Sequence, residues 1–244
     1  MRPATARPIR GAGVQTVYES LRQSIVDLEL PPGSPLDEVR LSQQFALSRT
    51  PVREALVRLV GDGLVTTLPN RSTVVAPIDF EKLPVYFEAL TLMYRVTIRA
   101  AAHRRTAGDL ARIRGFEAAY AQAVAERDVT GMIDSNRQFH VAIAEAGGNS
   151  YFTGLFCRLL DEGRRLLRLY YYGPVEDHLP HRYVDEHCAM VRAIDKGDAE
   201  LCDQLGAGHA AQIVRQIQSY IARDVTATMR LGETSAQPSR RSRS

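Results

Sequence analysis

Three histidines in the C-terminal part of the chain have the residue type and the setting for metal coordination. His140, His187 and His209 each lie in a segment with helical periodicity, and Asn136 precedes His140 by four residues. Residues four apart share one face of a helix, and side chains from three helices of an antiparallel bundle can converge on one ion. Neutral imidazoles suit zinc, nickel, copper or iron. Alternatively, these are separate core histidines held by hydrogen bonds, a commoner role for a buried histidine.

A second group of polar side chains has the composition of a DNA-reading surface. A helix N-terminus favours phosphate, arginine can pair bidentately with guanine, and serine and threonine suit phosphate oxygens or bases. The candidates are Arg40 on a predicted second helix, Ser48, Arg49, Thr50 and Arg53 at the start of a third, and Asn70 and Arg71 at a predicted hairpin tip. The alternative is that Arg49 and Arg53 are solvated surface arginines, one of them paired with Glu54 or Glu38.

The first 78 residues supply the elements that would present these side chains. The apolar spacing predicts three helices and a hairpin. Helix one starts at Val14, buries Val17, Leu21, Ile25 and Leu28 and stops at Pro31-Pro32-Gly33; helix two buries Leu36, Val39 and Leu41; helix three buries Val52, Leu56 and Leu59 behind a cap at Ser48 or Thr50. The runs LVTTL and TVVAP flank a turn at PNRS. This order predicts a winged helix-turn-helix whose third helix enters the major groove.

After Pro77 the pattern becomes purely helical, with no further strand candidate in about 150 residues. The predicted helices are Lys82–Arg104, Ala107–Arg127, Val129–Ala146, Ser150–Tyr171, His181–Lys196 and Ala199–Arg223. Long amphipathic helices with short connections predict an antiparallel bundle. The expected fold class is therefore mainly α, with a winged helix-turn-helix at 14–78, a helical domain at 79–231, and mobile tails at 1–13 and 232–244.

Composition limits the function classes without choosing among them. No apolar run approaches the roughly 20 residues of a membrane span, and no signal peptide is evident. The three cysteines, Cys157, Cys188 and Cys202, are an odd number, which predicts a reducing compartment and hence the cytoplasm. The net charge is only +3 and lies largely in the tails. Between residues 14 and 78 six arginines meet seven acids, so DNA binding must rest on local placement of charge.

The N-terminal region resembles the DNA-binding domain of the GntR superfamily. The resemblance runs along VYESLRQSIVDLELPPGSPLDEVRLSQQFALSRTPVREALVRLVGDGLVTTLPNRSTVVAPID, and SRTPVREAL with the following GLV is its most specific part. It implies that Arg40, Arg49 and Arg53 make the main DNA contacts and that the wing tip at Asn70-Arg71 adds others. Ser72 stands where family members commonly have glycine in the wing.

The C-terminal region resembles the FCD-type effector domain of the FadR-like branch, from about Lys82 to Arg223. The segments that carry the resemblance are SNRQFHVAIAEAGGNS, DEHCAMVRAIDKGDAE and GAGHAAQI. It implies a divalent transition metal, zinc or nickel, held by Asn136, His140, His187 and His209. Asparagine replaces the usual aspartate at 136 and offers only a neutral oxygen, which lowers the expected affinity. Asp134 should face elsewhere, and Cys188 should be a core residue because it points about 100° away from His187.

The same resemblance implies a small effector whose carboxylate takes the open coordination positions of the metal. The family's usual arginine and glutamate on the first helix of this domain are replaced by Leu90 and Tyr94. Further cation candidates, each expected at the surface, are Arg95, Arg99, Arg137, Arg165 and Arg168. The remaining histidines, expected at the surface or at helix ends, are His103, His178 and His181.

Together these patterns predict a ligand-responsive transcriptional regulator that binds double-stranded operator DNA as a homodimer. A repressor released by a small organic acid is the expected form. Three alternatives remain open: a metal-dependent hydrolase with Glu145 or Glu186 as a weak candidate base, a direct sensor of the metal, and a structural ion that locks the bundle.

Overall fold

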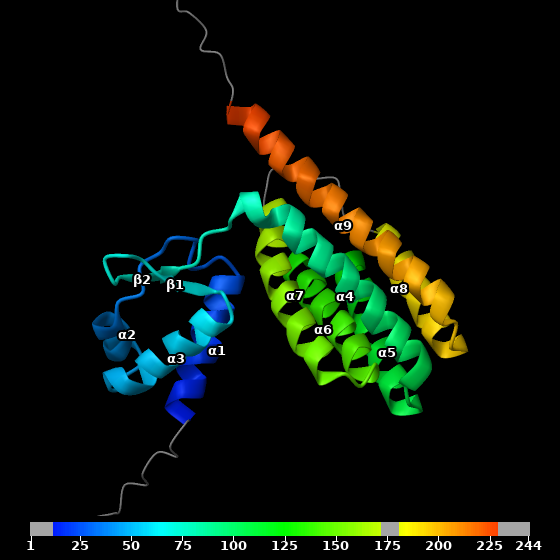
Figure 1. Ribbon diagram of the computed structural model, residues 1–244, viewed down its shortest axis with the longest axis horizontal. Helices are drawn as coiled ribbons and strands as arrows, with labels where there is room; N and C mark the ends of the chain where they lie inside the picture. Colours follow the sequence, from blue (N-terminus) through cyan, green and yellow to red (C-terminus); the bar gives the residue numbers. More distant parts are fainter. Residues whose placement is uncertain (1–11, 172–180, 229–244) are drawn as a thin grey trace, which may run out of the picture.

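A computed structural model of the chain describes residues 12–171 and 181–228. The N-terminal part contains α1 (Ala12–Val26), α2 (Glu38–Gln44), α3 (Arg49–Gly61), β1 (Val65–Thr67) and β2 (Thr73–Val75). After the 3-10 turn η1 (Phe80–Lys82) come α4 (Leu83–Arg104), α5 (Ala107–Glu126), α6 (Val129–Ala146), α7 (Ser150–Tyr171), α8 (His181–Lys196) and α9 (Ala199–Thr228). The three short helices and the hairpin lie beside a bundle of long helices (Figure 1). The predicted mainly α fold class is confirmed.

Helix α1 starts and ends earlier than the apolar spacing predicts. Ala12 and Gly13 are already helical, and the rest of the predicted N-terminal tail, like the predicted tail at 232–244, falls outside the described residues. The helix ends at Val26, and Leu28 takes a left-handed backbone conformation with φ 61°. Leu28 is only half-buried, so its assignment as a core position of the first helix is wrong. The helical repeat does not extend to Leu28, because the helix ends at Val26 and the backbone changes direction there.

The core of the N-terminal domain forms between α1 and α3. Val17, Leu21 and Ile25 pack with the predicted apolar residues of α3. In α2 the side chain of Asp37 caps the helix by accepting a hydrogen bond from the Arg40 backbone N–H at 2.7 Å. Ser48 occupies the N-cap position of α3, but its hydroxyl accepts no capping hydrogen bond.

One predicted core position of α2 is wrong. Leu41 is buried, and so is Leu36 just before the helix, whereas Val39 is 38% exposed. Val39 lies two residues before Leu41, about 200° around the helix, so a seven-residue helix with one buried stripe turns it to the solvent.

The predicted hairpin is present as a two-stranded antiparallel sheet in which Val65 lies opposite Val75 and Thr67 opposite Thr73. Its tip closes with serine at position 72. Arg71 takes the left-handed conformation with φ 65°, and the side-chain oxygen of Asn70 accepts hydrogen bonds from the Ser72 N–H at 3.0 Å and hydroxyl at 2.5 Å. The turn therefore forms without a glycine at 72.

The bundle helices agree closely with the predicted spans. Helices α6, α7 and α8 have the predicted bounds, and α9 continues past Arg223 to Thr228. Local signals explain several ends: Thr106 and Asp109 form a capping box at the start of α5, and Arg127 ends it in the left-handed conformation. Helix α4 lies along α9, and α5 along α6 (Figure 1). None of the helices in the described ranges is long and apolar enough to cross a membrane.

The N-terminal domain contacts the bundle through α1 and α7, and charged side chains dominate this contact. Arg22 of α1 hydrogen-bonds Asp161 of α7. Asp27, just after α1, pairs with Arg168 of α7 at 2.6 Å. Arg165 donates to the carbonyl oxygen of Ala76 at 2.6 Å. Arg165 and Arg168 are only 3% and 2% exposed, so their expected place at the surface is wrong. The approach of the N-terminal domain buries them.

Candidate metal centre and DNA-binding face

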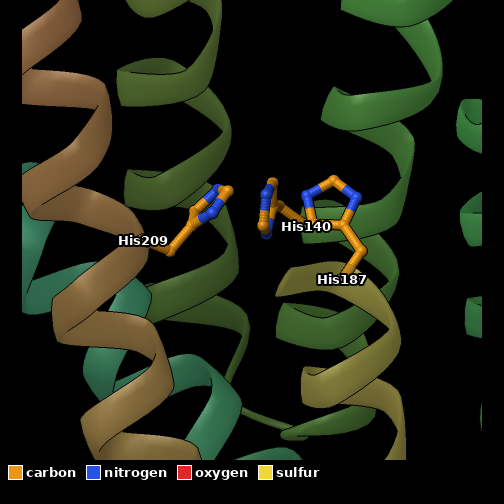
Figure 2. Close-up of side chains that lie close together, drawn as sticks. All are labelled: His140, His187 and His209. Atoms are coloured by element: carbon orange, nitrogen blue, oxygen red, sulfur yellow. The ribbon is translucent and has the colours of Figure 1, made fainter. Parts of the chain in front are cut away.

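Three helices bring the three predicted histidines together in the core of the bundle. His140 comes from α6, His187 from α8 and His209 from α9, and their rings gather in the space between these helices (Figure 2). The candidate ligand nitrogens all lie within 4.8 Å of one another. All three side chains are buried. Residues far apart in the chain thus form one cluster with three potential nitrogen donors.

The histidine nitrogens have the state that a metal requires. Within the described residues, His140 Nε2, both ring nitrogens of His187 and His209 Nε2 have no hydrogen-bond partner. Burial, with the neighbouring histidines, lowers the pKa of His140 and of His187 well below the ordinary value. Both rings are therefore neutral and keep a lone pair for coordination. Buried polar atoms without partners are rare because each carries a desolvation penalty, and a bound cation would satisfy one nitrogen of each ring.

Glu186 orients one of these rings. Its Oε2 lies 2.9 Å from His209 Nδ1, which leaves Nε2 directed at the cluster. Partial burial raises the pKa of Glu186, but the hydrogen bond with His209 and the contact with Arg182 outweigh it and lower the pKa overall. A carboxylate behind a ligating histidine fixes its tautomer and raises its basicity. In the sequence Glu186 is a candidate only for a general base, because its position one residue before His187 gives no sign of a contact with α9.

Asn136 lies one turn before His140 and lines a cavity of about 20 Å³ together with His209. It is half-buried, whereas Asp134 pairs with Arg164 of α7 and so faces away from the histidines, as predicted. Cys188 takes no part in the cluster. It is half-buried, and its thiol donates to Glu117 Oε1 at 3.0 Å, so its assignment to the core is wrong: its face of α8 meets α5 at the edge of the bundle.

The other candidate cations of the helical domain do not reach the histidines. Arg95 and Arg99 form exposed ion pairs with Asp203 and Glu200 of α9. Arg137 is half-buried and pairs with Asp161. Leu90 and Tyr94 are buried, and the Tyr94 ring meets the rings of His140 and His209 edge-on at centroid distances of 4.8 and 5.1 Å. The remaining polar candidates lie at the periphery: His103 and His181 are exposed, Glu145 pairs with Arg112 at 2.7 Å, and His178 lies outside the described residues.

The seven candidate DNA-binding side chains are all exposed on the N-terminal domain: Arg40, Ser48, Arg49, Thr50, Arg53, Asn70 and Arg71. Arg53 pairs with Glu38 through two hydrogen bonds of 3.1 and 2.8 Å. This was the alternative role considered for one of the recognition-helix arginines. Arg58 is also exposed; its guanidinium stacks 4.0 Å over the ring of Tyr18 and donates to Gln15.

A winged helix-turn-helix domain joined to a helical domain with a buried histidine cluster is the architecture of a ligand-responsive DNA-binding regulator. Two family models match the chain: the bacterial regulatory proteins of the gntR family over residues 14–75, and the FCD domain over residues 86–230. The chain therefore belongs to the gntR family of bacterial regulatory proteins and carries an FCD domain.

Individual relatives agree with this assignment. The chain is 27% identical over 208 residues to an uncharacterized HTH-type transcriptional regulator from Streptomyces ambofaciens, covering 83% of this chain and 84% of the relative. It is 30% identical over 211 residues to the HTH-type transcriptional repressor NanR of Cronobacter sakazakii, covering 78% and 79%. The solved structure of E. coli McbR/YncC has the same fold, with a TM-score of 0.72 at 22% identity, covering 89% and 99%. The chain is thus a transcriptional regulator and not an enzyme, and the hydrolase alternative is not favoured.

Proposed function

We propose that this regulator is a cytoplasmic homodimeric repressor, released from operator DNA when a small carboxylic acid binds a divalent metal in the helical domain. Residues 14–78 would bind DNA, and residues 79–231 would hold the ion and form the dimer. The observation that carries the proposal is the cluster of three buried histidines whose unpartnered nitrogens converge.

The donor set favours a transition metal such as zinc or nickel. His140, His187 and His209 would supply three imidazole nitrogens, and Asn136 a neutral amide oxygen, a set that suits these ions. All four ligands are uncharged, and the single carboxylate of Glu186 lies behind His209. A dication in this buried setting keeps uncompensated positive charge, which is costly away from water. An anionic effector that fills an open position would neutralise it, which supports a carboxylate.

On the DNA side, Arg49, Ser48, Thr50 and Arg53 would meet the major groove at the start of α3, with Arg40 and the wing-tip residues Asn70 and Arg71 on the backbone or the minor groove. To contact a base, the Arg53 guanidinium must break its ion pair with Glu38 or bind the base and Glu38 at the same time. Two N-terminal domains in a homodimer would bind half-sites about one helical turn apart, or a multiple of it, in a near-palindromic operator. The sign of regulation rests on relatives whose names include "repressor", such as NanR.

The experiment that tests the metal centre compares two double variants. The variant His187→Ala with His209→Ala should lose co-purified metal while it still binds operator DNA in fluorescence anisotropy. The matched control is His103→Ala with His181→Ala, which removes two exposed histidines from helices of the same domain. The control should keep its metal. Stoichiometric metal in the His187/His209 variant, measured by elemental analysis, would contradict the proposed ligands.

The same preparations distinguish the two remaining roles of the ion. Added metal alone should leave the operator affinity of the wild-type protein unchanged, whereas an acid added to the metal-loaded protein should weaken it. A change with metal alone would instead identify a direct metal sensor. Removal of the ion that lowers stability without any effect of acid on DNA binding would identify a structural ion.

A further inference from the structure

A second small cavity shares part of its lining, Asn136 included, with the cavity that contains His209. Asn136, Leu167 and Ile213 line both this cavity and the one that contains His209, so these three side chains form the wall between them. The second cavity also has a volume of about 20 Å³. Two arginines line it, Arg137 of α6 and Arg164 of α7, whereas the described lining of the first cavity holds no arginine or lysine.

Arg164 is a buried cation whose hydrogen-bonding capacity is not fully used. Its side chain is only 7% exposed, and within the described residues its Nε has no hydrogen-bond partner. Its Nη2 contacts Asp134 and lies 3.6 Å from Asp27. Desolvation by burial lowers the pKa of this guanidinium despite those carboxylates. A further anion beside Arg164 would therefore be stabilised both by charge and by a free N–H donor.

Arg137 lies between this cavity and the contact with the N-terminal domain. It lines the cavity and also a cleft of about 540 Å³ between α1 and the bundle. Its Nε donates to Asp161 Oδ1 at 2.5 Å, and the same carboxylate accepts from Arg22 of α1. Among the described ion pairs, Asp27, Asp134 and Asp161 serve four arginines: Arg22, Arg137, Arg164 and Arg168. Each of these three carboxylates is shared by two arginines.

We propose that Arg137 and Arg164 form an anion-binding site for a second acidic group of the effector, which makes the effector a short diacid. This inference rests on the proposed function: one carboxylate would bind the metal beside His209, and the other would enter the cavity lined by the two guanidiniums. The positions where the family resemblance implies an arginine and a glutamate, Leu90 and Tyr94, line this same cavity without charge. Helices α6 and α7 supply the cations instead.

The size of the cavities limits the length of the diacid. Each cavity by itself has room for about one water-sized group. An effector that uses both must pass between the side chains that the cavities share, and because Asn136 stays on the metal, the half-buried Leu167 is the side chain that must give way. A chain of few carbons fits this space, and the apolar wall residues suit its methylene groups.

The site also explains how effector binding reaches the DNA-binding domain. A carboxylate beside Arg164 of α7 competes with Asp27, which follows α1 and lies 3.6 Å from the same guanidinium. A weaker contact with Asp27 allows the N-terminal domain to change its placement on the bundle. A ligand shifts such an equilibrium only if it binds the two placements unequally, and direct competition for a shared guanidinium supplies that inequality.

The test is isothermal titration calorimetry of the metal-loaded full-length protein with acids matched in chain length. The diacids malonate, succinate and glutarate are compared with propionate, butyrate and valerate. We expect at least one diacid to bind about tenfold or more tightly than its monoacid partner. Arg164→Gln should abolish this preference, while Arg95→Gln, which removes an exposed arginine paired with Asp203, should keep it. Equal binding of diacids and monoacids, no binding of any acid, or an unchanged preference in Arg164→Gln would overturn the inference.

A second variant should gain affinity for the diacid, a result that misfolding of the protein could not produce. Asp134 is 43% exposed and competes for Arg164, so Asp134→Asn should bind the preferred diacid about two- to fivefold more tightly. Weaker or unchanged binding would count against the site. Metal content and operator affinity, measured on the same samples, separate this inference from the proposed function. Bound metal without a diacid preference overturns only the arginine site; a preference that depends on Arg164 in metal-free protein overturns only the metal ligation.

Discussion

Replacing His187 with leucine should have opposite effects on the stability of the metal-free and the metal-loaded protein. His187 is fully buried, and both of its ring nitrogens lack a hydrogen-bond partner within the described residues. Its ring stacks on Phe139 at a centroid distance of 4.3 Å and packs against Tyr120 at 4.7 Å, so aromatic rings surround much of it. An apolar side chain of similar size suits this environment when no ion is bound.

The magnitudes follow from the two unpartnered nitrogens. Removing a buried unsatisfied polar group recovers about 1–3 kcal/mol, and repacking a side chain of similar volume costs about 1.5 kcal/mol or less. The metal-free His187→Leu variant should therefore equal the wild type or exceed it by up to about 2–3 kcal/mol. With metal at a hundredfold excess over Kd, the wild type gains about 2.7 kcal/mol by mass action, and the variant loses most of that gain.

The assay is chemical unfolding with and without chelator, followed by circular dichroism. His103→Leu serves as the control because His103 is exposed near the end of α4. The stability of this control variant should respond to metal as that of the wild type does. A metal-free His187→Leu variant destabilised by several kcal/mol would refute the reasoning, because it would mean that the His187 nitrogens have partners and that the ring is a structural core residue.

Three further predictions concern the two sites. Arg49→Ala and Arg53→Ala should each weaken operator binding by about 1–3 kcal/mol if the residue reads a base; unchanged anisotropy titrations for both would remove α3 from the groove. Glu186→Gln should lower metal affinity by about 10- to 100-fold in a competition titration with a chelating dye, and equal affinity would show that the His209–Glu186 contact does not tune the ion. The pKa values of His140 and His187 lie below the ordinary value when folded, so the unfolded chain binds more protons in acid. The stability of the metal-free protein should therefore fall as the pH drops below about 6.5, and a flat profile between pH 7 and 5 would contradict the burial of neutral rings.

The fold could be predicted largely from local signals. Apolar periodicity and capping residues act within a few positions of the chain, so the sequence alone predicts the bounds of α6, α7 and α8. The same holds for the hairpin, where Val- and Thr-rich strands flank a turn. The errors at Leu28 and Val39 also have a local origin: one lies past the end of a helix and the other on the outer face of a short one.

The candidate site was predictable only in part. The histidines and Asn136 could be named because the resemblance to a family marked their positions, and periodicity placed them on helices. Neither the resemblance nor the periodicity could indicate that Glu186 of α8 would contact His209 of α9. Nor could they indicate that Arg164, which has no distinctive sequence context, would line a cavity together with Asn136.

The chain by itself therefore determined which segments are helical, which side chains could bind DNA or metal, and the class of regulator. The tertiary structure decided which charged side chains are buried and which of them form ion pairs. Arg165 and Arg168 look like surface residues on an amphipathic helix, yet the approach of α1 and the hairpin buries them, and Asp27 becomes a partner of Arg168 across the domain contact. The physical reason is that burial and ion pairing depend on which elements meet in space, whereas helical periodicity reports only on residues a few positions apart.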